Sequence, residues 1–171
     1  PEVGRTTVDD IHLVHGQPVA ESEMGRDPAT PVTESRLSTV IAAQSNHPVG
    51  HIGLQTIEAG EDALTAAVQE QAGSGARHIA FDGADRKHLA AVAALALKRF
   101  PEALLVGSAG LAQGLCDCLP HLPSEAAPEI VFRPGHHLIA LGTASARARR
   151  QVEVLRTACP RCALFELDPG R

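Results

Sequence analysis

The sequence predicts an α/β protein with parallel βαβ units in a Rossmann-like sheet, followed by the first βαβ unit of a second α/β domain. Three observations support this. Short apolar runs alternate with helix-like stretches of roughly 10–15 residues, as in βαβ units. Several runs end at small or polar residues typical of strand-to-helix turns. A proline-rich stretch at 120–134 separates the last strand–helix–strand pattern from the rest of the 171 residues.

The first third of the chain begins with extended segments. His12–Val19 predicts two short strands around a hairpin turn at His15-Gly16. A helix with a Ser or Thr cap is predicted over Thr33–Gln44, because its apolar residues share one face. His51–Ile57 is a strand candidate. We therefore expect a hairpin, a helix and a strand in this order.

The middle of the chain repeats a strand-and-helix order. A helix is predicted to end at Gly73-Ser74-Gly75, and another is predicted to stop at Pro101. The predicted elements are a helix at Glu61–Ala72, a strand at His78–Phe81, a helix at Asp85–Phe100, a strand at Ala103–Val106 and a helix reaching about Leu119. Strands that alternate with helices in this way pair in parallel.

A new unit is expected after the proline-rich stretch. It consists of a strand at His137–Leu141, a helix ending near Ala158 and a strand at Ala163–Leu167. One such unit cannot bury both faces of its sheet, so we expect it to be incomplete or to complete a core elsewhere. The predicted division is a first domain at 1–119, a linker at 120–136 and a second domain at 137–171.

Composition and charge exclude several classes of function. The net charge is −5 and aromatic residues make up 2%, which argues against a broad nucleic-acid surface and against base stacking. The longest apolar run, Leu89–Leu97, is too short to span a bilayer, and no signal peptide opens the chain. Four cysteines form no disulfide framework at this length, so the cytosol is the expected compartment.

Two strand-to-helix turns are candidate ligand sites. They are Gly107-Ser108-Ala109-Gly110 and Gly142-Thr143-Ala144-Ser145. A helix N-terminus offers free N–H groups and a partial positive charge, and small residues let a phosphate come close. The alternative is that small residues merely suit tight turns. Neither turn has the residues of a P-loop or of the dinucleotide fingerprint.

A second group of candidates lies near the N-terminus. Arg5 stands in Gly4-Arg5-Thr6-Thr7, and Arg26 and Asp27 stand side by side in a proline-rich loop. Arginine binds carboxylate or phosphate in a two-pronged way, and an aspartate can accept hydrogen bonds from substrate hydroxyls or act as a base. The alternative is that Arg26 and Asp27 pair with neighbours and fix the loop.

The cysteines also suggest a metal site, which we do not expect. Cys159-Pro160-Arg161-Cys162 has the spacing of zinc ligands, and Cys116 and Cys118 could supply two more. However, Cys-x-Cys is not the usual knuckle pair. A thioredoxin-type pair would open a helix, whereas Cys159 follows one.

Several motifs in order resemble the four-carbon acid sugar kinase family. The resemblance is carried by Gly4-Arg5-Thr6-Thr7, His12-Leu13-Val14, Gly16-Gln17-Pro18-Val19, Glu21-Ser22-Glu23, Arg26-Asp27-Pro28, Pro31-Val32, Glu34-Ser35, Asp82, Leu89, Gly107-Ser108-Ala109-Gly110-Leu111-Ala112, Gly142-Thr143-Ala144-Ser145 and Gln151. It covers essentially the whole chain. Proteins of this family have a sugar-binding N-terminal domain and a nucleotide-binding C-terminal domain.

The resemblance implies an ATP-dependent kinase of a four-carbon sugar acid of the threonate, erythronate or oxo-tetronate type, with Mg²⁺ sharing the phosphate charge. It implies that Arg5, Arg26 and Asp27 line the sugar-acid side. It also implies nucleotide binding by Thr143, Ala144, Ser145 and Ser108, with Ser108 near the cleft between domains. The catalytic residue is not identified. The implied organisation is the later part of the sugar-acid domain, a linker and the start of the nucleotide domain.

The sequence also departs from the family pattern. Asp10 stands where the family usually has Gly, His88 replaces an acidic residue, and Ala148 stands where Thr is common. The family's Asp-Asp-x-Thr-Gly-Ala-like segment and its later Gly-rich segment are absent, so we expect no turnover by this polypeptide alone. Two alternatives stay open: a non-catalytic truncated relative that binds ligands or partners, and a Rossmann-like cofactor enzyme. An incomplete sheet would favour a homo-oligomer.

Overall fold

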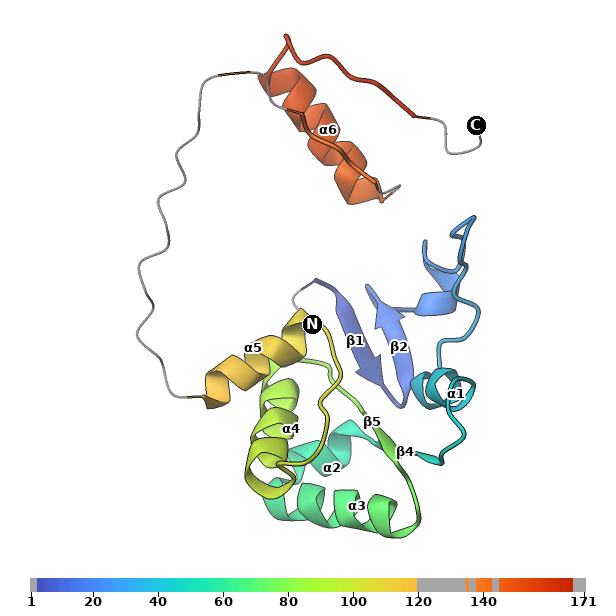
Figure 1. The fold of residues 1–171 in the computed structure, drawn as a ribbon, viewed down its shortest axis with the longest axis vertical. Coiled ribbons are helices and arrows are strands. Elements are labelled where there is room, and N and C mark those ends of the chain that lie inside the picture. Colours follow the sequence, from blue (N-terminus) through green and yellow to red (C-terminus); the bar gives the residue numbers. More distant parts are fainter. Residues whose placement is uncertain (1–2, 120–134, 136–137, 143–144, 168–171) are drawn as a thin grey trace. The chain divides into compact units, whose positions relative to one another are not determined.

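The computed structural model describes residues 3–119, 135, 138–142 and 145–167 (Figure 1). The chain divides into two compact units, Pro1–Pro123 and Ser124–Arg171, each described here by itself. In the part of the chain that the structure describes, no helix has the length and apolar character needed to cross a membrane.

The first unit opens with a small antiparallel sheet. Its strands are β1 (Arg5–Val8), β2 (Ile11–Val14) and β3 (Gln17–Pro18), in the order β1-β2-β3. The predicted hairpin turn at His15-Gly16 is confirmed, and both residues have positive φ. A short 3-10 helix, η1 (Val19–Glu21), continues the chain into the loop that precedes α1 (Leu37–Ala42).

A parallel pair of strands forms the centre of the first unit. Strand β4 (Val49–Ile52) pairs with β5 (His78–Phe81), and α2 (Leu54–Glu58) and α3 (Glu61–Gly73) lie between them in sequence. This crossover confirms the predicted α/β class. Helix α4 (Arg86–Arg99) follows β5, and the apolar core is formed by Ile52, Ile57, Leu64, Val68, Val92 and Leu95.

Helix α5 (Ala109–Cys118) packs beside α4 (Figure 1). The two backbones come so close at Gly114 that a Cβ there would lie 3.0 Å from the backbone of Leu89 and Ala90. Arg86 and Asp117 join the same helices, with Nε donating to Oδ2 at 2.8 Å. Glycine at position 114 is therefore needed for close packing of α5.

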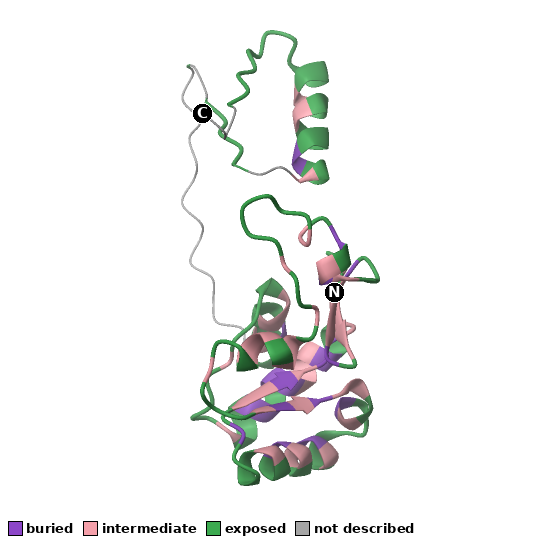
Figure 2. Ribbon diagram, turned by 90° about the vertical axis from the view of Figure 1, so that its right-hand side faces the viewer, coloured by how far each residue is buried: buried purple, intermediate pink, exposed green. Residues whose placement is uncertain are grey.

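The second unit contains α6 (Ala146–Ala158), as the sequence predicts. The Ser145 hydroxyl accepts a hydrogen bond from Ala148 N at 3.2 Å and so caps this helix. Figure 2 shows buried residues gathered at β4, β5 and their helices, whereas most described residues of the second unit are exposed.

Three of the predicted strands differ from the structure. Ala103–Val106 and Ala163–Leu167 are not strands, and neither are residues 138–141 of the predicted His137–Leu141, whose first residue lies outside the described residues. These apolar runs have no strand partner among the described residues. Leu104, for example, is 88% exposed and Phe165 84% exposed. An apolar run alone therefore did not specify a strand, because a strand also needs a partner for its backbone groups.

Two other boundaries are also corrected. The helix predicted at Thr33–Gln44 begins only at Leu37, and its N-cap residue Arg36 makes no side-chain capping bond. The strand predicted at His51–Ile57 ends at Ile52, where Gly53 starts α2. A contact with a residue distant in sequence sets the start of α1. Gly53 sets the end of β4.

Candidate functional site

The buried carboxylate of Asp82 fixes the carboxyl end of the parallel strands. It follows β5 and accepts hydrogen bonds from Asp9 N at 2.7 Å, from Asp10 N at 3.0 Å and from His51 Nε2 at 2.9 Å. Thr7 and Gly83 exchange two backbone hydrogen bonds beside it. The turn between β1 and β2 therefore covers the strand end where ligands often bind in parallel sheets.

A second buried carboxylate, that of Asp10, connects this turn to α1. Its Oδ1 accepts from Ser38 N at 2.9 Å, its Oδ2 accepts from the Ser38 hydroxyl and from Arg36 Nη1 at 3.3 Å, and its carbonyl accepts from Leu37 N. Asp10 thus caps α1 from a distant part of the sequence. Its φ of 67° lies in the left-handed region, which glycine adopts without strain.

One face of the β1–β2 hairpin carries three polar side chains beside the buried Val14. In the register, Arg5 faces Val14 and Thr7 faces His12, so alternation places Arg5, Thr7 and His12 on the same face. Thr7 Oγ1 lies 3.2 Å from His12 Nδ1. Among the described residues no hydrogen bond engages His12 Nε2. We call Arg5, Thr7 and His12 the hairpin face.

The charge state of His12 follows from its surroundings. Burial, and then the nearby guanidinium of Arg5, lower the pKa of His12 below its ordinary value of 6.5. The imidazole is therefore neutral at pH 7 and can donate or accept a hydrogen bond. A cation, a hydroxyl and a neutral imidazole on one face suit a small ligand with a carboxylate and hydroxyl groups.

The loop that carries Arg26 and Asp27 is held by its own hydrogen bonds. Arg26 Nη2 donates to the carbonyl of Glu21 at 2.9 Å, and Asp27 Oδ1 accepts from Ala29 N and Thr30 N, both at 2.9 Å. The bonds from Thr30 and then Ala29 lower the pKa of Asp27. Both side chains are exposed. Among the described residues, no hydrogen bond or ion pair joins Arg5 to Arg26 or Asp27.

The predicted nucleotide-binding residues lie in different parts of the chain. Ser108 is the exposed N-cap residue of α5 and makes no side-chain capping bond. Ser145 caps α6 in the second unit. Thr143 and Ala144 lie outside the described residues.

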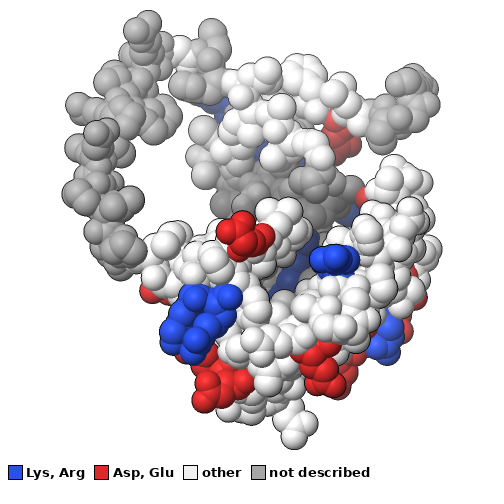
Figure 3. All heavy atoms as spheres, turned by 60° about the horizontal axis from the view of Figure 1, so that its bottom comes forward, with Lys and Arg blue, Asp and Glu red and all other residues white. Residues whose placement is uncertain are grey.

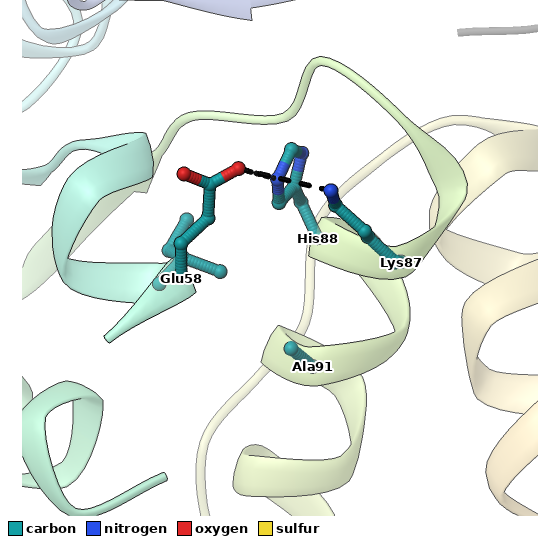
Figure 4. Close-up of a pocket in the computed structure, with 5 residues that line it drawn as sticks. Glu58, Lys87, His88 and Ala91 are labelled. Carbon is teal, nitrogen blue, oxygen red and sulfur yellow. Dashed lines mark hydrogen bonds and ion pairs between the residues drawn. The ribbon is translucent and has the colours of Figure 1, made fainter. Parts of the chain in front are cut away.

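A pocket of about 340 Å³ lies between α2 and α4 (Figure 4). Its lining is Ile57, Glu58, Lys87, His88 and Ala91. Because His88 Nδ1 accepts from Ala84 N at 3.3 Å and Asp85 N at 3.2 Å, the imidazole proton is on Nε2, which donates to Glu58 Oε1 at 2.9 Å. His88 and Lys87 both face the Glu58 carboxylate, so much of the pocket's polarity is satisfied internally.

Separate patches of both signs are visible on the face shown in Figure 3. Glu61 forms ion pairs with Lys98 at 2.8 Å and with Arg99 at 3.0 Å, and these two partners lower the pKa of Glu61. Among the described residues drawn on this face, the basic patches are small and separate.

Sequence reasoning found Arg5 but did not single out Thr7 or His12 as site residues. Both lie in motifs that carry the family resemblance, and alternation along a hairpin could have placed them with Arg5. The pocket residues Glu58 and Lys87 had no signal in the sequence, because helix packing brings them together.

Comparisons with known proteins show to which family the chain is similar. A family model described as a sugar-binding N-terminal domain matches residues 1–115. A D-threonate kinase from Salmonella typhimurium is 34% identical over 153 residues, which are 90% of this chain and 34% of that protein. A D-erythronate kinase from Heliobacterium modesticaldum is 30% identical over 162 residues, which are 95% of this chain and 36% of that protein.

A solved structure shows the likeness in fold. A Haemophilus influenzae protein of the DUF1537 family has a TM-score of 0.64 and 22% identity, and the match covers 92% of this chain and 37% of that one. The chain spans about a third of the length of the curated relatives given above. With a sugar-binding domain matched over more than half of its residues, the chain belongs to the four-carbon acid sugar kinase family.

Proposed function

We propose that this chain supplies the sugar-acid-binding part of a kinase that transfers a phosphoryl group from ATP to a four-carbon sugar acid. The substrate is of the threonate, erythronate or oxo-tetronate type, as in the names of the relatives. The observation that carries the proposal is the hairpin face, which lies within the matched residues 1–115.

The chemistry of the hairpin face matches such a substrate. Arg5 would bind the carboxylate through two parallel hydrogen bonds. Thr7 Oγ1 and the neutral His12 would face the hydroxyl groups. This division of roles needs the substrate carboxylate to lie over the start of β1.

Arg26 and Asp27 keep capacity for a ligand in this proposal. Among the described residues, Arg26 uses one of its five N–H donors on Glu21, and Asp27 uses Oδ1 alone for its loop. The remaining guanidinium donors and Oδ2 of Asp27 would bind the sugar acid. The loop bonds then hold both groups in place before the ligand arrives.

For the nucleotide, we propose contacts with Thr143, Ala144, Ser145 and Ser108. The Ser145 hydroxyl and the first N–H groups of α6 suit phosphate oxygens. Mg²⁺ in kinases is held largely by phosphate oxygens and one or two carboxylates. We propose that Mg²⁺ binds together with ATP.

The organisation that we propose follows from the family. Residues 1–119 would be the later part of the sugar-acid domain, 120–136 the linker and 137–171 the start of the nucleotide domain. The protein would work in the cytosol, on small molecules and not on nucleic acid or membranes, and a homo-oligomer would cover its exposed apolar runs.

Binding of D-threonate and D-erythronate by calorimetry tests the proposal. Arg5→Ala is expected to weaken binding of the acids about 10–100-fold, the loss of a charge-assisted contact. The matched control is Arg77→Ala, which removes an exposed arginine that precedes β5 at its other end. Equal effects of the two variants, or no binding of either acid, would contradict the proposal.

An assay of substrate turnover provides a separate test. Incubated with ATP, Mg²⁺ and each acid, the 171-residue chain should bind substrate without forming a phosphorylated product. A phosphorylated tetronate produced by this polypeptide alone would show that the rest of the family pattern is not needed for catalysis.

A further inference from the structure

The end of α6 brings two cysteines into one turn. Cys159 follows the last helical residue, and its N–H donates to Leu155 O at 2.8 Å. Cys162 N donates to Cys159 O at 2.9 Å, which closes a turn over Pro160 and Arg161. Both cysteines are free and exposed.

This turn has dimensions that suit a disulfide. A turn closed by a bond from residue i+3 to residue i holds its end Cα atoms within about 7 Å of each other. Disulfides span Cα distances of about 4.4–6.8 Å. Pro160 occupies the second position, where its fixed φ favours such a turn. The turn therefore keeps the two Cα atoms within about the span of a disulfide.

A metal is a weaker interpretation of the same pair. Structural zinc takes about four protein ligands. In the described ranges, no group of three or more His, Cys, Asp or Glu side chains is placed to hold an ion. The pair offers two sulfurs, which is the number that one disulfide requires.

We propose that Cys159 and Cys162 are an oxidation site that closes a reversible intramolecular disulfide, with oxidised glutathione as the electron acceptor. One cysteine sulfur, as thiolate, attacks the glutathione disulfide and releases one glutathione thiolate. The second sulfur attacks the resulting mixed disulfide and releases the other. The protein loses two electrons and two protons, and oxidised glutathione becomes two molecules of reduced glutathione. This proposal is independent of the kinase proposal.

The other two cysteines provide a matched control. Cys116 and Cys118 are exposed, two residues apart in α5. Residues two apart on a helix point about 200° away from each other, so they cannot bond while the helix is intact. A double variant Cys116→Ser/Cys118→Ser keeps only the proposed pair, and Cys159→Ser/Cys162→Ser keeps only the control pair.

The test equilibrates the reduced chain in glutathione buffers of increasing oxidised fraction, followed by alkylation and mass spectrometry. The expected result is a fall from four to two alkylated thiols, with a mass loss of about 2 Da for the disulfide. Trypsin cuts after Arg156 and Arg161, so the disulfide should join peptide 157–161 to peptide 162–171. Reduction should restore all four thiols.

The variants decide the assignment. Cys116→Ser/Cys118→Ser should lose both remaining thiols at the same oxidised fraction as the unchanged chain. Cys159→Ser/Cys162→Ser should form no intramolecular disulfide. Four thiols that persist in excess oxidised glutathione, glutathione adducts without ring closure, or cross-links only between chains would overturn the proposal.

Discussion

Asp10 combines a left-handed backbone with a buried carboxylate, two features that favour different residues. Glycine would adopt its φ of 67° without strain, but it would remove the acceptor for Ser38 N, the Ser38 hydroxyl and Arg36. Asp9 beside it has a similar φ of 53°, yet its side chain is exposed. Substitutions at the two positions therefore distinguish the effect of backbone strain from the effect of capping α1.

Glycine substitutions at these two positions should have different effects. Asp10→Gly is expected to lower the free energy of unfolding by about 1–3 kcal/mol, because it leaves buried partners without an acceptor. Asp9→Gly should be neutral or stabilise by up to about 1 kcal/mol. Urea denaturation of both variants measures the difference. Equal losses would mean that the Asp10 carboxylate does not support α1.

His12 gives the hairpin face a pH dependence. Its folded pKa is lowered by burial and by Arg5, so the unfolded chain binds the proton more tightly. Stability is then complete above the unfolded value of 6.5 and falls as the pH drops towards the folded pKa. His12→Gln should make the dependence of unfolding free energy on pH flatter as the pH falls below about 7. Identical slopes for both proteins would contradict this.

Helix α4 begins with a capping box. Its N3 residue is His88, at a position where the acceptor is usually the side chain of Glu or Gln. Asp85 accepts from Lys87 N and His88 N, while His88 accepts from Asp85 N and donates to Glu58. A side chain at position 88 must therefore accept on one side and donate on the other.

Glutamine meets both demands and leucine meets neither. His88→Gln should change the free energy of unfolding by less than about 0.5 kcal/mol, whereas His88→Leu should lower it by about 1–3 kcal/mol. Thermal and urea unfolding of the two variants provide the comparison. A glutamine variant as unstable as the leucine variant would show that the imidazole shape, and not its hydrogen bonds, is required.

The contact between α4 and α5 predicts opposite effects of alanine at two glycines. In Gly114→Ala the new Cβ would meet backbone atoms of α4 at 3.0 Å, and we expect a loss of about 1–3 kcal/mol in stability. Gly73→Ala, at the end of α3, meets nothing within 4 Å and should gain up to about 1 kcal/mol from helix propensity. Denaturant midpoints of both variants are the measurement; a gain in both would contradict the close packing.

Local signals predicted the elements whose ends are set locally. Helix α4 begins after its cap Asp85 and stops before Pro101, and α3 ends beside Gly75, close to the predicted positions. The start of α1 was missed because its cap, Asp10, lies 28 residues away from Ser38. Patterns of neighbouring residues in the sequence cannot reveal a contact across 28 residues.

At the scale of the whole molecule, the sequence predicted the α/β class but not which apolar runs become strands. Strands β4 and β5 pair with each other, whereas Ala103–Val106 has no pairing partner among the described residues. The same limit applies to the site. Arg5 could be chosen by its chemistry, but its alignment with Thr7 and His12 needs the register of the hairpin.

The bonds from Asp82 to the turn have a consequence for hydrogen exchange. Amides in a two-residue hairpin turn ordinarily exchange with solvent in locally opened states. The amides of Asp9 and Asp10 instead donate to a fully buried carboxylate 72 or 73 residues away, so their release requires separation of the two sheets. In deuterium exchange followed by NMR, these amides should be protected about as strongly as those of β5. Rapid exchange at the turn, with β5 still protected, would show that the hairpin opens alone.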